Sequence, residues 1–419
     1  MSKSQIRSIK GTQDILPGET EKWQRLEQLV RSTMDTYNYK EIRTPIFEKT
    51  ELFDRGVGNQ TDIVSKEMYS WTDQGGENLT LKPELTAPVS RAYIQHNLGS
   101  KQPLTKLYYI DALFRRERPQ KGRYRQFHQF GVEAFGSENP EIDSEIIAIA
   151  VSIFKQLDIK DLRLKINSIG SDVCRANFKE ELKIFLKPHF DSLSETSKVR
   201  FKKNPLRILD SKSEEEIKLM QNAPSISDYW TPDDKAHFTE LCNFLDAMGI
   251  KFEIDHNLVR GLDYYSRTTF EILSSSLGAQ DALCGGGRYD GLVEMIGGKP
   301  TPGIGFAAGI ERILLASAQE FDENKIKLYI VGLGEKVRVK VVELAELLRE
   351  NHIPCDYDML RRSMKAQLRE ANKMRANYAI IIGENELEKS QIELKDLTTG
   401  DQQKVAMESI LSHLKSLSF

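Results

Sequence analysis

The chain has 419 residues, of which 39% are hydrophobic and 29% are charged, a composition typical of soluble globular proteins. This length exceeds what one ordinary core holds, so two or three domains are expected. The formal net charge of −3 excludes a generally basic nucleic-acid-binding protein, and any basic surface must therefore be local.

The four cysteines predict neither a metal centre nor a disulfide framework. Cys174, Cys242, Cys284 and Cys355 are scattered, with no Cys-x-x-Cys motif and no His pair at ligand spacing. We expect all four to be small buried hydrophobes. The first 18 residues contain no apolar signal segment, and no apolar run is long enough to span a bilayer. We therefore expect an enzyme of the reducing cytoplasm, without a membrane partner.

The first expected elements are a long helix over residues 19–37 and an extended segment over residues 41–48. The helix is indicated by apolar residues at helical spacing, namely Trp23, Leu26, Val30, Met34 and Tyr37. Pro45 in the extended segment favours the edge of a sheet or an interface, because proline cannot donate to a strand ladder.

Two strands are then predicted, over residues 107–114 and 127–135. A short charged loop joins them, which favours an antiparallel pair. A helix over residues 141–157 and an alternating strand over residues 162–166 follow.

Residues 171–250 differ in character from their surroundings. They are rich in Lys, Glu, Ser and Asn, show helical periodicity, and are broken by three prolines, Pro188, Pro205 and Pro224. We expect a helical insertion between strands of the core, which resume at residues 251–254 and 268–272.

The last part of the chain begins a new alternation after an expected boundary at residues 321–327. Strands are predicted over residues 328–331, 354–359 and 378–382, and helices over residues 337–350 and 364–375. Strands separated by helices are typical of a small α/β domain with a parallel component. We expect a first domain of residues 1–325, which includes the insertion, and a second domain of residues 326–419.

Residues 115–125 hold six basic residues and one acid, Glu117. Guanidinium groups match phosphate oxygens with paired hydrogen bonds. On charge alone, a solvated hairpin tip is the more ordinary interpretation. The flanking strands favour another one: Phe114-Arg115-x-Glu117 at a strand end, with a return strand that reaches Glu133, resembles motif 2 of class II aminoacyl-tRNA synthetases.

Two further segments resemble motifs of the same class. Residues 302–315 combine close-packing glycines with an apolar helix that carries Arg312, as in motif 3, where the arginine lies against ATP. The alternative for Arg312 is an exposed helix residue beside Glu311. Residues 19–47 resemble motif 1, which forms the dimer interface, although a helix followed by a strand is weak evidence alone.

Three segments narrow the resemblance to the histidyl-tRNA synthetase family. Residues 260–265, Arg-Gly-Leu-Asp-Tyr-Tyr, resemble the signature of that family. Residues 83–86 carry polar groups that suit an α-ammonium, and Gln129 and Glu133 share one face of a strand. Residues 10–14 and 285–290 extend the resemblance over nearly the whole chain. Residues 285–287 lack a following Lys-Ser/Thr, so we interpret these glycines as a close backbone approach and not as a phosphate loop.

The resemblance implies a role for each matching residue. Arg115 and Arg260 are expected to be catalytic, with Arg260 stabilising phosphoryl charge where other class II enzymes use a metal. The implied histidine ligands are Glu84, Thr86, Arg115, Gln129, Glu133, Arg260, Tyr264 and Tyr265. Within this set, Glu133 and Tyr265 meet the imidazole, whereas Glu84, Thr86 and Gln129 meet the α-amino group. The implied ATP ligands are Arg115, Glu117, Arg123, Phe127 and Arg312, and the implied tRNA acceptor contacts are Arg118 and Gln120.

Structural interpretations of the same residues stay open from the sequence. Tyr264 and Tyr265 suit core or interface packing, and Glu133 suits a buried acid paired with an arginine. No metal ligands of the protein are identified, and Mg²⁺ is expected to bridge the outer phosphates of ATP.

The implied fold is α+β: an antiparallel class II synthetase sheet flanked by helices, with the insertion and a C-terminal α/β anticodon-binding domain. The implied reaction joins L-histidine to tRNA(His) through histidyl-adenylate, in a homodimer. The C-terminal part is barely basic, with 16 Lys and Arg against 14 Asp and Glu from Lys325 onward, so its charge alone does not indicate RNA binding.

Two alternatives remain at this point. The first is the synthetase-like regulatory subunit of ATP phosphoribosyltransferase, which lacks the C-terminal domain and commonly departs from the 260–265 motif. The second is a class II synthetase for threonine, proline or glycine. For the insertion, clamping of the tRNA acceptor arm is a hypothesis without sequence support.

Overall fold

The computed structural model describes residues 5–58, 61, 63–120, 122–211, 213–262, 264–277, 281–317 and 328–417. The chain divides into two compact units, Met1–Phe321 and Asp322–Phe419, which we call the N-terminal and C-terminal units. The boundary expected at residues 321–327 lies outside the described residues. Among the residues described, no helix has both the length and the apolar character that crossing a membrane requires.

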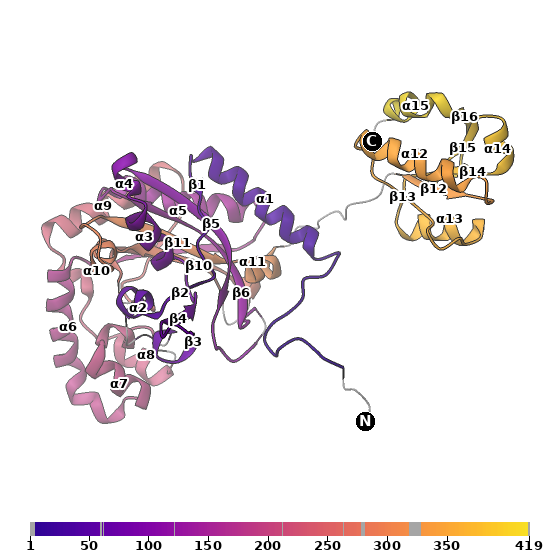
Figure 1. The fold of residues 1–419 in the computed structure, drawn as a ribbon. Coiled ribbons are helices and arrows are strands. Elements are labelled where there is room, and N and C mark those ends of the chain that lie inside the picture. Colours follow the sequence, from indigo (N-terminus) through magenta and orange to yellow (C-terminus); the bar gives the residue numbers. More distant parts are fainter. Residues whose placement is uncertain are drawn as a thin grey trace. The chain divides into compact units, whose positions relative to one another are not determined.

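An eight-stranded sheet forms the centre of the N-terminal unit (Figure 1). In spatial order its strands are β1 (Lys40–Glu41), β5 (Thr105–Phe114), β6 (Gln126–Phe135), β11 (Gly303–Gly309), β10 (Ala282–Arg288), β9 (Ser266–Ser274), β7 (Leu162–Ser168) and β8 (Glu253–Ile254). The two edge strands pair in parallel, and all other pairs are antiparallel. The expected antiparallel core is therefore confirmed.

Strands β5 and β6 are the antiparallel pair that the sequence predicts. Leu113 lies opposite Phe127, and Phe114 lies opposite Gln126, so the basic loop leaves and re-enters the sheet at one end. The other side of β6 pairs with β11, in the register Gly305 opposite Glu133. This pairing brings two segments far apart in the sequence together in the middle of the sheet.

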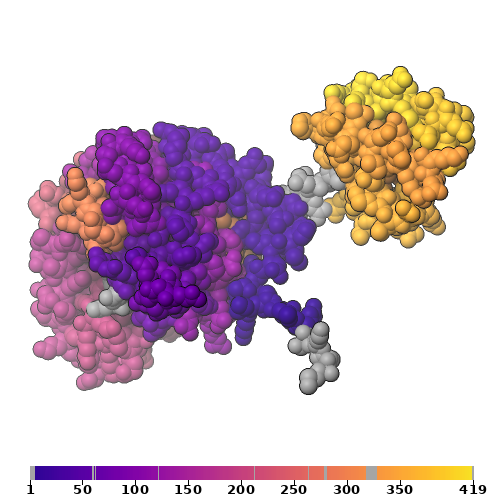
Figure 2. Space-filling model, viewed as in Figure 1, coloured from indigo at the N-terminus to yellow at the C-terminus, as the bar shows by residue number. Residues whose placement is uncertain are grey.

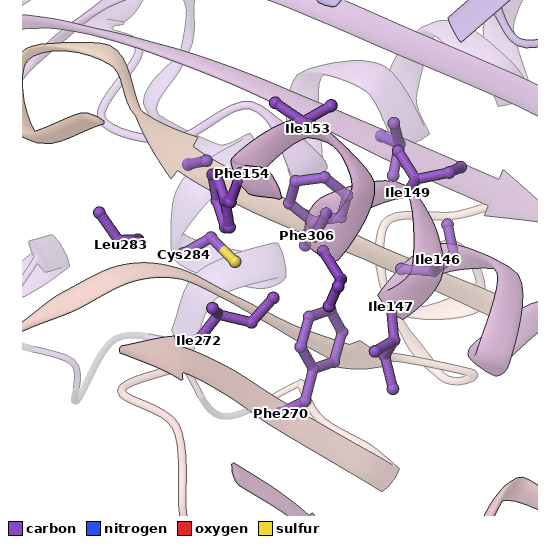
Figure 3. Packing of buried hydrophobic residues seen from close by; sticks show 14 of the residues in the cluster. Ile146, Ile147, Ile149, Ile153, Phe154, Phe270, Ile272, Leu283, Cys284 and Phe306 are labelled. Carbon is purple, nitrogen blue, oxygen red and sulfur yellow. The ribbon is translucent and has the colours of Figure 1, made fainter. Parts of the chain in front are cut away.

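Helices cover the sheet and supply its main core. Two of them, α1 (Thr20–Thr36) and α5 (Pro140–Gln156), belong to this core, as does α11 (Ile310–Ala316). Figure 3 shows apolar side chains of α5 facing those of β9, β10 and β11: Ile146, Ile147, Ile149, Ile153, Phe154, Phe270, Ile272, Leu283, Cys284 and Phe306. Fully burying one such side chain stabilises the fold by about 1.5–3 kcal/mol. This core holds the strands of the sheet in place. The same strands carry polar residues that are described below.

The extended segment expected over residues 41–48 is two strands and not one. Its start is β1 at the edge of the large sheet. Its end is β2 (Phe47–Lys49), which belongs to a separate sheet with β4 (Asn78–Leu81) and β3 (Tyr69–Thr72). Pro45 lies between them, where the lack of an N–H prevents one continuous ladder.

Smaller helices complete this part of the N-terminal unit. They are α2 (Thr50–Phe53), η1 (Asp54–Gly58), η2 (Ile63–Glu67), α3 (Thr86–Gln95), α4 (Leu98–Lys101), η6 (Ser275–Leu277) and α10 (Leu292–Met295). Helix α3 begins directly after residues 83–85, so its N-terminus positions one of the predicted binding segments.

The helical insertion lies between β7 and β8, as expected. It comprises α6 (Asp172–Leu186), η3 (Lys187–Ser192), α7 (Glu195–Lys203), η4 (Pro205–Ile208), α8 (Glu214–Met220), η5 (Ile226–Tyr229) and α9 (Pro232–Ala247). Figure 1 shows α6 and α7 (pink) grouped together, away from α1. Helix α9 differs from the rest, because its Phe238, Leu241 and Leu245 belong to the main core. The last helix of the expected insertion is thus part of the sheet's own covering layer.

All four cysteines are free thiols. Cys174, Cys284 and Cys355 are buried, as expected, whereas Cys242 is only partly buried. Burial raises the pKa of the Cys174 and Cys242 thiols to about 11. The thiols therefore stay protonated at neutral pH and behave as packing groups.

The C-terminal unit is a five-stranded sheet with helices. In spatial order the strands are β13 (Cys355–Tyr357), β12 (Leu328–Gly332), β14 (Tyr378–Ile382), β15 (Gln391–Asp396) and β16 (Gln402–Ala406). The helices are α12 (Arg338–Glu350), α13 (Met364–Lys373), α14 (Glu384–Glu388), η7 (Met407–Ser409) and α15 (Ile410–Ser416). The first three strands are parallel, which confirms the predicted parallel component. The polar hairpin β15–β16 was not predicted, because it lacks the apolar run of a buried strand.

Candidate active site

A cavity of about 500 Å³ opens in the N-terminal unit, where the basic loop, the start of α3 and the segment before β9 meet above β6, β10 and β11. Its wall contains most of the residues that the sequence predicted for ATP and histidine: Glu84, Thr86, Arg115, Glu117, Arg123, Phe127, Gln129, Arg260, Tyr264, Tyr265 and Arg312. Segments separated by nearly 230 positions thus line one pocket. This pocket has the size and the polar lining of a site for a small molecule.

Arg115 is fixed at the end of β5 by three contacts. Its Nε donates a hydrogen bond to the Pro83 carbonyl oxygen at 2.8 Å. Its guanidinium lies over the Phe127 ring, 5.2 Å from the centroid, and its Nη1 is 3.8 Å from Glu117 Oε1. Glu117 also lies 3.4 Å from Arg123 Nη1. Burial lowers the pKa of Arg115, but a guanidinium stays charged at neutral pH, so a fixed cation faces the cavity.

Arg312 lies in the first turn of α11 and adds another cation to the same wall. Burial and the positive charge of Arg123 both lower the pKa of Arg312. Two guanidinium groups that repel each other in a partly buried wall favour an anion between them. Arg312 is therefore a cavity residue, and the alternative of a purely exposed helix position does not hold.

Glu311, next to it in sequence, has a structural contact that the sequence did not reveal. Its carboxylate accepts a hydrogen bond from the His128 backbone N–H at 2.9 Å and lies 3.0 Å from His128 Nδ1. The His128 ring in turn packs edge-to-face on Trp23, with centroids 4.8 Å apart. These contacts tie α11 to β6 and α1, and so fix the direction of the first turn that carries Arg312.

Arg260 lies over β10 and is held by an ion pair, with 2.7 Å between its Nη1 and Glu271 Oε1. A Cβ atom at Gly285 would collide with the Arg260 guanidinium, which is the close backbone approach that the sequence predicted. Burial works against the charge of Arg260, but the Glu271 carboxylate outweighs it and raises the pKa above its ordinary value. Within the described part of the chain, the buried Nε of Arg260 has no hydrogen-bond partner. This donor is available to a ligand.

The opposite end of the cavity begins with Glu84, just before α3. Its two carboxylate oxygens accept hydrogen bonds from the backbone N–H groups of Thr86 and Ala87, both at 2.9 Å. A carboxylate at a helix N-terminus satisfies unpaired N–H groups and interacts favourably with the helix dipole. Burial nevertheless raises the pKa of Glu84 above its ordinary value. The helix thus holds this acid at the cavity wall.

Glu133 differs from its predicted position in the site. It is only 1% exposed and lies beneath the cavity floor, against the backbone of Gly305. Its carboxyl accepts hydrogen bonds from Thr86 Oγ1 at 2.8 Å, from the Tyr109 hydroxyl at 3.1 Å, and from the Tyr289 hydroxyl. Burial raises its pKa to about 8. Three hydroxyl groups, and not the arginine of the structural alternative, are therefore the partners of Glu133.

Tyr264 and Tyr265 are buried side chains that line the cavity, with ring centroids 4.8 Å apart. Tyr264 also packs against Tyr289, at 5.7 Å. Burial raises the pKa of both tyrosines above the ordinary phenol value. Both hydroxyls are therefore protonated at neutral pH and able to donate. The neighbouring Asp263 lies outside the described residues.

Two predicted residues lie elsewhere. Arg118 and Gln120 are exposed and line a separate surface hollow, together with Lys66, Glu67, Arg116 and Arg123. The hollow is on the outer side of the basic loop and shares Glu67, Glu117 and Arg123 with the cavity. The loop thus presents one set of side chains to the cavity and another set to solvent.

Several cavity residues were missed from the sequence. They are Glu271, Tyr289, Glu311, Arg200, Arg207 and Asp210. Glu271 had a signal, because it is an acid directly between the apolar residues Phe270 and Ile272 of a strand. Tyr289 belongs to a segment that the resemblance already covered. The last three come from the insertion, whose composition gave no indication that it reaches the site.

The described residues contain no group of three His, Cys, Asp or Glu side chains arranged to hold a metal ion. The cavity carboxylates are already engaged: Glu117 with Arg123, Glu271 with Arg260, and Glu311 with His128. This donor set does not fit a metal cage made by the protein. It fits a Mg²⁺ ion that is carried mainly by substrate phosphates.

Comparisons with known proteins identify the family. The family model "Histidyl-tRNA synthetase" matches residues 11–313, and the model "Anticodon binding domain" matches residues 327–417. The chain is 48% identical to "Histidine--tRNA ligase" from Halothermothrix orenii, over 98% of this chain and 99% of that protein. It is equally similar to the protein of the same name from Thermoanaerobacter pseudethanolicus, with the same coverage.

A solved structure agrees with these sequences. The apo histidyl-tRNA synthetase of S. aureus superposes with a TM-score of 0.84 at 38% identity, covering 98% of this chain and 99% of that one. Similarity of this extent includes the sheet, the insertion and the C-terminal unit. The chain therefore belongs to the histidyl-tRNA synthetase family.

Proposed function

We propose that this protein activates L-histidine with ATP to histidyl-adenylate and transfers histidine to the 3′ end of tRNA(His), releasing AMP and pyrophosphate. The observation that carries the proposal is the position of Arg260 in the cavity. Its guanidinium lines the same cavity as Tyr265 and Arg312, and its Nη1 lies 2.7 Å from Glu271 Oε1. An amino acid and a triphosphate would meet at this cation.

The activation step requires charge stabilisation more than proton transfer. The histidine carboxylate is ionised at neutral pH and attacks the α-phosphorus of ATP, so no general base is needed. A new carboxyl O–P bond forms as the bond to pyrophosphate breaks, and negative charge grows on the phosphoryl oxygens. Arg260 and Arg115 are cations placed for these oxygens, and removal of one such group typically costs about 10²–10³-fold in rate.

The remaining ATP contacts follow from the same wall. We assign the adenine ring to the face of Phe127, its amino group to Glu117, and the outer phosphates to Arg123 and Arg312. Mg²⁺ would enter with the phosphates and neutralise part of their charge. Glu117, Glu271 and Glu311 of the protein are engaged with other side chains.

Selection of histidine rests on hydrogen bonds to both ring nitrogens. Imidazole presents two nitrogens, either of which donates or accepts. We assign the ring to Tyr264, Tyr265 and the hydrogen-bonded group around Glu133, and the α-amino group to Glu84, Thr86 and Gln129. An analogue without these nitrogens would leave buried polar groups unpaired, which is worth about 10⁴-fold discrimination without editing.

The tRNA would contact two regions. Arg118 and Gln120 on the outer side of the basic loop are assigned to the acceptor end. The C-terminal unit is assigned to the anticodon, whose unstacked bases are read by their edges and by stacking. Charging should weaken with salt, because phosphate contacts release counterions.

We also propose a homodimer of the reducing cytoplasm. Support for the dimer comes from Ile46 and Phe47 in the segment that resembles motif 1, which are 43% and 49% exposed, and from Trp71, which is 40% exposed and packs on Phe47 at 6.0 Å. Large exposed apolar groups next to each other are typical of interfaces. Sedimentation equilibrium should give twice the chain mass, and a monomer at micromolar concentration would contradict the proposal.

The direct test is the transfer of labelled histidine to tRNA in the presence of ATP. We expect a product that is sensitive to ribonuclease and whose formation requires both ATP and full-length tRNA. A regulatory subunit of ATP phosphoribosyltransferase would bind histidine but form no such product. Charging with proline, threonine or glycine instead would show that the amino-acid assignment is wrong.

A further inference from the structure

We propose that Arg207 of the helical insertion is a positioning residue for the activation step: it anchors residues 259–262 and thereby holds the Arg260 guanidinium in the cavity. This inference rests on the proposed function of the cavity. It also gives the insertion a role in the chemistry itself, which is separate from any contact with tRNA.

Two arginines connect the insertion to residues 259–262: one bonds this segment, and the other bonds the backbone of the first. Nη2 of Arg207, in η4, donates a hydrogen bond to the Gly261 carbonyl oxygen at 2.7 Å. Nη1 of Arg200, in α7, donates to the Arg207 carbonyl oxygen at 2.9 Å. Leu206 and Ile208, on either side of Arg207, are buried in the core that includes the insertion. A packed helical element therefore bonds the backbone next to Arg260.

The segment that carries Arg260 needs such an anchor. Residues 258–262 belong to no helix or strand, and a Cβ atom at Gly261 would meet nothing within 4 Å. On the N-terminal side, the Leu258 carbonyl oxygen accepts hydrogen bonds from Asn167 Nδ2 at 3.1 Å and from Thr269 Oγ1 at 3.5 Å. On the C-terminal side, the Gly261 carbonyl is bonded by Arg207. Arg260 thus lies between one anchor from the sheet and one from the insertion.

The insertion also borders the cavity itself. Arg200, Arg207 and Asp210 are part of its wall. A second hollow, of about 390 Å³, lies between the insertion and the segment around Lys66, and Lys203 lines it as well. Figure 2 shows the surface of the insertion (pink) adjoining that of the first part of the chain (indigo to violet). Arg207 is therefore close enough to affect the cavity without a nucleic acid present.

The effect should appear in a reaction that does not contain tRNA. We would measure histidine-dependent ATP–pyrophosphate exchange for the wild type, Arg207→Ala, and the control Lys203→Ala, an exposed residue of the neighbouring helix turn that lines the same hollow. We expect Arg207→Ala to lower kcat about tenfold, the typical effect of losing one hydrogen bond from a charged donor. Lys203→Ala should stay within twofold of the wild type.

A double-mutant cycle shows whether Arg207 acts through Arg260. If it does, Arg207→Ala should change the residual exchange of Arg260→Ala less than twofold, because the group being positioned is already absent. Backbone amide exchange of residues 259–262 should also be faster in Arg207→Ala. A purely structural role would lower the rate by the same factor in both backgrounds.

Three results would overturn the inference. The first is normal exchange by Arg207→Ala combined with impaired tRNA charging, which would make Arg207 a tRNA contact. The second is an equal loss with and without Arg260. The third applies if Arg207→Ala melts near the assay temperature. The test then uses Arg207→Met, which keeps an apolar stem but has no N–H donor, and full wild-type exchange by it would reject the anchor. Absence of exchange in the wild type would instead reject the proposed function.

Discussion

The two ends of the cavity differ in the polar groups that line them. At the end assigned to histidine, acids and hydroxyls bond to one another, and the Glu133 carboxyl accepts hydrogen bonds from Thr86, Tyr109 and Tyr289. At the end assigned to ATP, the guanidinium groups of Arg115, Arg123 and Arg312 line the cavity. Burial raises the pKa of Glu133 at the first end to about 8, whereas the guanidinium groups of the second end stay charged.

This difference shows how one pocket can combine selectivity with catalysis. Hydrogen-bonded neutral groups discriminate between ligands of similar size, because a missing partner leaves a buried polar atom unpaired. Fixed cations stabilise charge that develops on phosphoryl oxygens. Arg260 lies between these regions, and its ion pair with Glu271 raises its pKa above the ordinary value. We therefore predict that substitutions at the first end change ligand selectivity and stability, whereas substitutions at the second end change the rate of the activation step.

The largest effect is expected at Arg260. Arg260→Ala should lower histidine-dependent pyrophosphate exchange by about 10²–10³-fold. The loss should fall mainly on kcat, since the charge that Arg260 stabilises is greatest in the transition state. Steady-state exchange kinetics at saturating ATP would measure it. Near-normal exchange would remove Arg260 from the mechanism and with it the distinction between the two ends.

A smaller effect on the same group is expected from Gly285→Ala. The new Cβ would collide with the Arg260 guanidinium and displace it, and a displacement of about 1 Å can cost on the order of 10²-fold in rate. We expect a loss of at least tenfold with little change in thermal stability. Gly291→Ala is the matched control, because its Cβ would meet nothing within 4 Å. Equal activities of the two variants would contradict the described packing.

A few-fold effect is expected from Arg118→Ala on the outer side of the basic loop. Exchange should be unchanged, because Arg118 lies outside the cavity. The KM for tRNA should rise a few-fold, and the slope of log affinity against log salt should fall by about 1. Charging assays at salt concentrations from about 50 to about 200 mM would measure the KM for tRNA and its dependence on salt. A changed exchange rate would show that the loop's two faces are not independent.

A last effect is expected on stability and not on rate, and it depends on pH at the histidine end. The unfolded Glu133 loses its proton near its ordinary pKa, whereas the folded carboxyl keeps it up to about 8. Between these values the folded state binds the extra proton, so the free energy of unfolding falls as pH rises. The slope from this group is at most about 1.4 kcal/mol per pH unit.

Glu133→Gln removes this titration and keeps the shape of the side chain. Denaturant unfolding of the ligand-free proteins would be measured from about pH 5.5 to about pH 8, where Glu133 titrates. The slope of the free energy of unfolding against pH is then compared between the wild type and Glu133→Gln. We expect a flatter profile for Glu133→Gln than for the wild type. Parallel profiles would show that Glu133 is ionised in the fold, and that the histidine end is not a neutral network.

The sequence predicted the fold where local patterns carry the information. The strand pair β5–β6, the helix α5 and the parallel strands of the C-terminal unit each follow from periodicity and from turn or breaker residues. Local patterns also pointed to two residues that line the cavity: Arg312 is a charged residue in an apolar helix, and Arg115 follows the apolar end of a strand. In each case the signal lies within about ten residues of the element that it specifies.

The parts that were missed depend on contacts between distant segments. The hydroxyls that bond Glu133 come from residues 24, 47 and 156 positions away, and no local pattern indicates them. Helix α9 has the polar surroundings of the insertion but packs on the main core. Arg207 is one arginine among many in a charged segment. Its contact with Gly261, 54 positions away, exists only in the folded chain.

The central claim is that one cavity joins a histidine-selective end to a cationic ATP end. The most direct measurement is ATP–pyrophosphate exchange by the wild-type protein with each of the twenty amino acids in turn. Histidine alone should support exchange, and Arg260→Ala should abolish nearly all of it. Exchange with another amino acid at a comparable rate, or no exchange with histidine, would contradict the account.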